Sequence, residues 1–97
     1  MSRQQVLKYL KSFKTWSLSP SKKAIRRELQ MKDFMSAIRF INRIAALAEK
    51  EGHHPDIHLS SYRSLMIEVW THAIDGLSEN DFILAAKIDR LPKKIKR

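Results

Sequence analysis

The spacing of the apolar residues in this 97-residue chain alternates between a helical and a strand period, and this alternation limits the folds open to it. The stretches with helical spacing are residues 3–14, 33–51 and 78–91. The stretches in which apolar and polar residues alternate are residues 15–18, 25–31, 56–60 and 65–71. The order α-β-β-α-β-β-α predicts an α+β domain, a four-stranded antiparallel sheet with three helices packed on one face.

Residues with known preferences for helix ends mark the boundaries of the two longer helices. Asp33 can accept hydrogen bonds from the first turn of the helix that follows it, and Gly52 suits the left-handed position after the same helix. Ser78 can cap the last helix, with Asp81 three residues on as its partner in a capping-box-like pair. Pro92 is expected to end that helix.

The length and the charge distribution narrow the class of protein further. A chain of 97 residues suits one domain, so we expect residues 1–97 to form one, with a basic tail at residues 92–97. The formal net charge is +9, yet residues 28–91 hold ten acidic and seven basic side chains, and residues 1–27 hold eight basic ones and no acid. Because the positive charge gathers at the ends, we expect no specific nucleic-acid partner.

Several kinds of site are excluded by residue types that the sequence lacks. It has no Cys, which rules out disulfides, thiolate zinc sites and a cysteine nucleophile. With Gly52 and Gly76 as its only glycines, the chain cannot build a glycine-rich phosphate loop, and no GxSxG motif occurs. No apolar run approaches the roughly 18–20 residues needed to span a bilayer.

All four histidines fall within 20 residues, mostly in the loop-like stretch after the long helix. They are His53, His54, His58 and His72. Adjacent residues of an extended chain point in different directions, so joint metal chelation by His53 and His54 is awkward. A structural role remains open. Imidazole exchanges protons near neutral pH, and the clustering therefore favours acid–base catalysis without a metal. The nearby carboxylates that could orient the rings are Glu49, Asp56 and Asp81.

The spacing of these residues resembles the signature of the pterin-4a-carbinolamine dehydratases. Three residues separate Glu49 from the run His53-His54-Pro55, and six more lead to Tyr62; His72 follows after nine residues and Asp81 after a further eight. The segments LAEKEGHHPDIH and GLSENDF fit the family as well. The resemblance covers about residues 16–91.

The resemblance implies a reaction and roles for these residues. A 4a-hydroxytetrahydropterin would lose water to give the quinonoid dihydropterin, in recycling of the tetrahydrobiopterin used by aromatic amino acid hydroxylases. His53 and His72 would be the proton-transfer pair, with His54 binding and polarising the ring, and neither metal nor cofactor would be needed. The supporting residues would be Glu49, Pro55, Thr71 and Asp81. From the residues alone, Asp81 can equally be a helix cap and Glu49 a solvated helix residue.

The resemblance also implies a homodimer or homotetramer, with sheets joined at their edges and long helices packed together. The broad apolar stripe of residues 34–48 agrees with this, and a buried helix in a monomer explains it equally well. The alternative function is a non-catalytic dimerisation or coactivator module that binds partner helices through the same stripe. Trp70 alternates with Met66 and Glu68, which predicts that it lies on the outer face of the sheet.

The N-terminal stretch bears on the cellular location of the protein. The Ser-containing, acid-free N-terminal stretch resembles an organelle transit peptide. The spacing of Val6, Leu7, Leu10 and Phe13 nevertheless favours a packed helix of the domain itself. Since the family's domain already uses this first helix and Trp16, little chain is left for a cleaved presequence. We therefore expect a cytoplasmic protein.

Overall fold

The computed structural model describes residues 1–92, so the predicted basic tail lies almost wholly outside the described residues. The helices are α1 (Arg3–Leu10), α2 (Phe34–Glu51) and α3 (Glu79–Asp89), with a short 3₁₀ helix, η1 (His72–Ile74). The strands are β1 (Ser17–Leu18), β2 (Ile25–Gln30), β3 (Asp56–Ser60) and β4 (Ser64–Val69). The predicted order of helices and strands is confirmed. Within residues 1–92, no helix combines the length and the apolar character needed to cross a membrane.

Several elements end earlier or begin later than the sequence predicts. Helix α3 ends at Asp89, with Arg90 as its C-cap, so the helix stops before the predicted stop at Pro92, and β2 ends at Gln30 instead of residue 31. Helix α1 stops at Leu10, because the next residues form tight turns in which the N–H of Phe13 bonds to the carbonyl of Leu10. Strand β1 is only two residues long. Strand β4 ends at Val69 instead of Thr71, because Thr71 pairs with Gly76 and closes the loop around η1.

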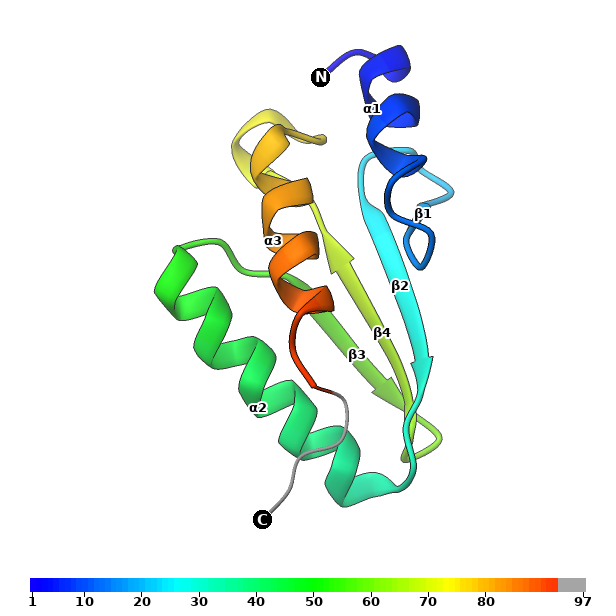
Figure 1. Cartoon of the computed structure of the whole chain (residues 1–97), viewed down its shortest axis with the longest axis vertical. Coiled ribbons are helices and arrows are strands. Elements are labelled where there is room, and N and C mark those ends of the chain that lie inside the picture. Colours follow the sequence, from blue (N-terminus) through cyan, green and yellow to red (C-terminus); the bar gives the residue numbers. More distant parts are fainter. Residues whose placement is uncertain (93–97) are drawn as a thin grey trace.

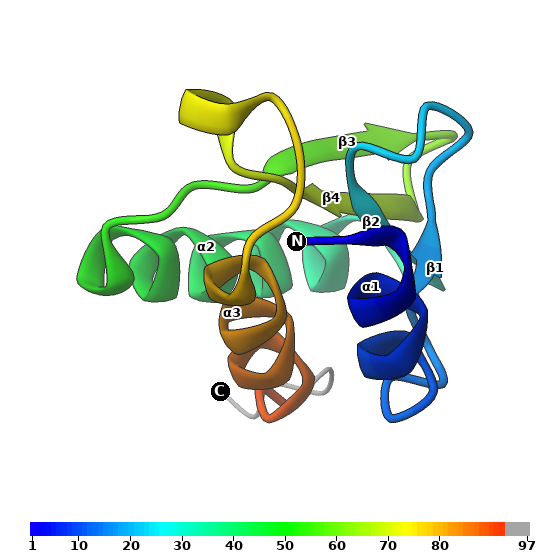
Figure 2. The ribbon, with the colours of Figure 1, turned by 90° about the horizontal axis from the view of Figure 1, so that it is seen from above.

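The four strands form one antiparallel sheet in the order β1-β2-β4-β3. Figure 1 shows the long strands β2 and β4 side by side, and Figure 2 shows α1, α2 and α3 on the same side of the sheet, as predicted. The core lies between these layers. Its largest fully buried apolar side chains are Phe40, Ile44, Ile25, Leu65, Ile67, Val69, Leu84 and Ile88.

The other face of the sheet is polar. Arg26 donates from Nε to a carboxylate oxygen of Glu68 at 2.5 Å, and His58 lies 3.3 Å from the second oxygen of the same carboxylate. His58 pairs with Met66 in the sheet; Met66 alternates with buried neighbours, and His58 alternates with half-buried ones that pack against the core. The sheet therefore separates His58 from the helices.

Both ends of α2 are fixed as the sequence predicts. The Asp33 carboxylate accepts from the backbone N–H of Ser36 at 2.8 Å, and this hydrogen bond holds the pKa of Asp33 below its ordinary value. Gly52 adopts a left-handed conformation with φ 65°, and nothing lies within 4 Å of where a Cβ would be. The backbone angle, and not a lack of space, favours glycine there. The chain then turns directly into His53.

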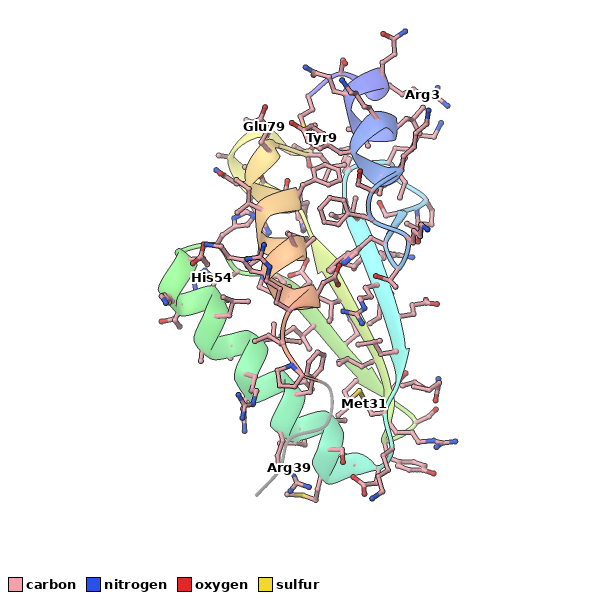
Figure 3. All side chains as sticks on the ribbon, in the orientation of Figure 1. Arg3, Tyr9, Met31, Arg39, His54 and Glu79 are labelled. Atoms are coloured by element: carbon pink, nitrogen blue, oxygen red, sulfur yellow. The ribbon has the colours of Figure 1, made fainter. Side chains whose placement is uncertain are left out.

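The N-terminal residues belong to the folded domain, as the apolar spacing predicts. The ring of Tyr9 stacks on that of Phe82 in α3, with 5.1 Å between centroids, and Phe13 packs on the same ring at 5.5 Å. Figure 3 shows Tyr9 lying between α1 and α3. The early basic stretch is therefore partly structured.

A carboxylate of α3, Asp89, links this N-terminal segment to β2. Arg27 lies on the inner face of the sheet, and its Nη1 donates to Oδ1 of Asp89 at 2.7 Å. The indole Nε1 of Trp16 donates to the same oxygen at 2.9 Å. Asp89 thus neutralises a cation in the apolar layer and holds Trp16 in place.

Replacement of this carboxylate is expected to destabilise the domain. Asp89→Ala leaves the buried Arg27 and the indole N–H of Trp16 without their acceptor, at a cost of about 1–3 kcal/mol in the free energy of unfolding. Lys23→Ala removes the exposed Lys23–Asp75 ion pair and is the control, with an expected cost below about 1 kcal/mol. Urea denaturation measures both, and equal costs would contradict this role for Asp89.

Candidate active site

A fully buried carboxylate, Asp81, lies at the centre of the candidate site. One oxygen, Oδ1, lies 2.6 Å from Nε2 of His53. The other, Oδ2, accepts from the hydroxyl of Thr71 at 3.0 Å and from the backbone N–H of Ser78 at 2.8 Å. Burial of a carboxylate is costly unless hydrogen bonds compensate it, and here partners from three chain segments do so.

The sequence near Asp81 explains how it reaches this position. Ser78 and Asp81 form a capping box at the start of α3, as predicted. The hydroxyls of Thr71 and Ser78 lie 2.7 Å apart, and the pairing of Thr71 with Gly76 closes the intervening loop. Helix capping and contact with His53 are therefore two functions of one side chain. The structure therefore shows Asp81 as a helix cap and also as the hydrogen-bond partner of His53.

His54 points toward a different carboxylate from its neighbour. Its Nε2 makes a short hydrogen bond with Glu49, one turn back in α2, and both side chains are mostly exposed. Figure 3 shows His54 at the C-terminal end of α2, where the chain leaves for β3. His53 and His54 thus diverge, as the sequence predicts. Among residues 1–92, no group of three or more His, Cys, Asp or Glu side chains is arranged to hold a metal ion.

His72 is held by an aromatic stack that was not predicted from the sequence. Its ring centroid lies 3.9 Å from that of Trp70, and the ring planes are inclined by 25°. The indole Nε1 of Trp70 donates in turn to Asp56 at 2.9 Å. The carboxylate of Asp56 therefore positions the indole of Trp70, and the indole in turn contacts the imidazole of His72. The sequence did contain a signal for this stack. Trp70 lies two positions before His72, and residues two apart in an extended chain share a face.

The structure joins some of the predicted site residues directly and others through neighbours. His53, Thr71 and Asp81 are in hydrogen-bond contact. His54 and Pro55 follow His53 in the chain, and His72 follows Thr71. A pocket of about 160 Å³ lies beside His53, with Gly52, His53, Asn80 and Leu84 among its lining residues. His58 lies apart, on the outer face of the sheet.

Removal of the central carboxylate is expected to destabilise the domain. Asp81→Ala leaves the hydroxyl of Thr71 and the N–H of Ser78 without an acceptor, for an expected cost of about 2–4 kcal/mol. Glu79→Ala removes an exposed carboxylate from the same helical turn and is the control, expected to cost about 0.5 kcal/mol or less. Chemical denaturation measures the difference, and the expectation is wrong if the two variants are equally stable.

The fold and the site define a class of protein. It is a small α+β domain in which histidines form hydrogen bonds with carboxylates at one end of an antiparallel sheet. The family model described as "Pterin 4 alpha carbinolamine dehydratase" matches residues 1–91 of the chain. The chain belongs to this family, and the resemblance seen in its sequence is confirmed.

Curated relatives carry the same description. The chain is 44% identical over 93 residues to "Pterin-4-alpha-carbinolamine dehydratase 2, mitochondrial" of Arabidopsis thaliana, an alignment that covers 94% of the chain and 50% of the relative. It is 45% identical to a "Putative pterin-4-alpha-carbinolamine dehydratase" of Halorhodospira halophila, over 94% of the chain and 83% of that relative. The chain thus spans about half the length of the plant relative.

Two solved structures share the fold. One, "transcriptional coactivator/pterin dehydratase from Brucella Melitensis", superposes with a TM-score of 0.84 at 28% identity and covers 92% of this chain and 94% of that one. The other is described as a "pterin dehydratase-like protein as a RuBisCO assembly factor in the alpha-carboxysome". It has a TM-score of 0.63 at 20% identity, covers 77% of this chain and 86% of its own, and shows likeness of fold alone.

Proposed function

We propose that this chain removes water from a 4a-hydroxytetrahydropterin to give a quinonoid dihydropterin, a step in tetrahydrobiopterin recycling. The bond from C4a to the hydroxyl oxygen breaks, the oxygen leaves with an added proton as water, and N5 gives up its proton. The observation that carries the proposal is the contact of His53 with the buried Asp81, at the sheet end where the chain also places His54 and His72. Family membership supports the same reaction.

The proposed chemistry needs one group that gives a proton and one that takes a proton. With Nε2 of His53 engaged by Asp81, Nδ1 is the nitrogen that would exchange a proton with the pterin. His72 is exposed, and its stacked ring would serve the other proton transfer. His54 would bind and polarise the pterin ring. No metal or cofactor enters this reaction.

The remaining site residues would position these rings. Asp81 fixes the orientation of His53, and Glu49 does the same for His54. Thr71 ties the end of β4 to Asp81 and so places His72, while Pro55 shapes the link from His54 into β3. A cytoplasmic location stays a prediction, since the Arabidopsis relative is described as mitochondrial.

The histidines offer a direct test with an internal control. His53→Ala and His72→Ala are each expected to lower the dehydration rate about 10²–10⁴-fold, the usual contribution of a general acid or base. His58→Ala removes an imidazole that contacts Glu68 on the outer face of the sheet, away from Asp81 and His53, and is expected to leave the rate within about twofold. The measurement is the initial rate of 4a-hydroxytetrahydropterin loss, with circular dichroism as a check on folding.

Two results would refute the dehydratase proposal. The first is a wild-type rate no faster than buffer alone. The second is a loss in His58→Ala that equals the loss in His53→Ala.

A second candidate function rests on the long helix. Phe34, Ile38, Ile41 and Ala45 form an apolar stripe along α2 beside its buried side. Phe34 is 49% exposed, and Ala45 is exposed as well. The Brucella protein is described as a transcriptional coactivator as well as a pterin dehydratase. We propose that this stripe joins copies of the chain into a homodimer or homotetramer, or receives a partner helix.

Adjacent alanines of α2 test the assembly proposal. Ala45→Glu places a charge within the stripe and is expected to lower the molar mass in solution. Ala46→Glu adds the same charge at an exposed neighbour outside the stripe and is expected to leave the mass unchanged. Light scattering at several protein concentrations measures both. A monomeric wild type, or an equal effect of the two variants, would contradict self-association through this stripe.

A further inference from the structure

A second pocket lies beside the residues that follow His72 in the chain, next to Asp75, Gly76 and Leu77. Its volume is about 250 Å³, and it lies between α1, the turn from β1 to β2 and the loop after η1. Its apolar floor includes Val6, Leu18 and Leu77, and basic side chains at its rim include Arg3, Lys22 and Lys23. Figure 3 shows Arg3 at the N-terminal end of α1, far from His54. We call this site the basic pocket.

The rim of the basic pocket has an excess of positive charge. Asp75 is the acidic residue among its lining side chains, and it pairs with Lys23 at 2.6 Å. Within residues 1–92, neither Arg3 nor Lys22 makes a salt bridge. Two other basic residues of the N-terminal stretch are neutralised elsewhere, Arg26 by Glu68 and Arg27 by Asp89.

The floor of the basic pocket is apolar, which distinguishes it from a simple basic surface. Val6 and Leu77 are 7% and 5% exposed, and Leu18 is half-buried. Phosphate groups of a nucleic acid have no apolar part that would fill such a floor. The volume is slightly below the range of about 300–1,000 Å³ that is typical of drug-sized ligands, which favours a small molecule.

We propose that the basic pocket binds a free aliphatic carboxylate of medium chain length. Its chain would lie on Val6, Leu18 and Leu77, and its carboxylate would accept charge-assisted hydrogen bonds from Arg3 and Lys22. The site is separate from the histidines, and no part of the dehydratase proposal assigns it a ligand. The loop from Asp75 to Leu77 forms one wall, so ligand binding is expected to perturb the backbone of Gly76.

Three probes separate the contributions of the chain and the charge. Octanoate carries both, acetate keeps the charge without the long chain, and 1-octanol keeps the chain without the charge. Titration of the full ¹⁵N-labelled chain with octanoate is expected to shift the amides of Val6, Lys23, Gly76 and Leu77 saturably. Acetate and 1-octanol are each expected to bind at least tenfold more weakly.

Charge reversal provides the matched variants. Lys22→Glu is expected to weaken octanoate binding about tenfold or more, whereas Lys11→Glu makes the same change at an exposed residue outside the pocket and is expected to change it less than twofold. The proposal is overturned if octanoate causes no saturable shifts, if the shifts lie elsewhere, or if both variants weaken binding equally. The readout does not use dehydration, so its failure leaves the proposed function intact.

Discussion

The buried carboxylate of Asp81 is the constraint on which the arrangement of this site depends. A carboxylate removed from water needs hydrogen-bond donors, and the donors come from the chain after α2, the end of β4 and the start of α3. These segments must therefore meet at one point. The same contacts that stabilise the charge orient His53 and bring the loop of His72 to the same end of the sheet.

Local patterns predicted most of the fold, because the type and the ends of each helix or strand depend largely on a few neighbouring residues. The spacing of apolar residues predicted α2, and Asp33 and Gly52 predicted where it begins and ends. Errors arose where tertiary contacts override local spacing. Thr71 continues the alternation of β4, yet it leaves the strand because it pairs with Gly76 and bonds to Asp81.

The sequence predicted which residues belong to the candidate site, but it did not predict several of the contacts between them. Resemblance to the family singled out His53, His54, His72 and Asp81, and the capping-box spacing placed Asp81 at the start of α3. The stack of Trp70 on His72 and the bond from Trp16 to Asp89 were not predicted. Trp16 and Asp89 are 73 residues apart, and a periodic pattern carries no information about partners at such a separation.

The central claim is that His53, His54 and His72 form one pterin site at this end of the sheet. The most direct measurement is the imidazole NMR spectrum of the protein during titration with a stable pterin such as 7,8-dihydrobiopterin. We expect saturable shifts of the ring signals of these three histidines with one common dissociation constant, while the signals of His58 stay in place. Shifts confined to His58, or no saturable shift in any imidazole, would contradict this claim.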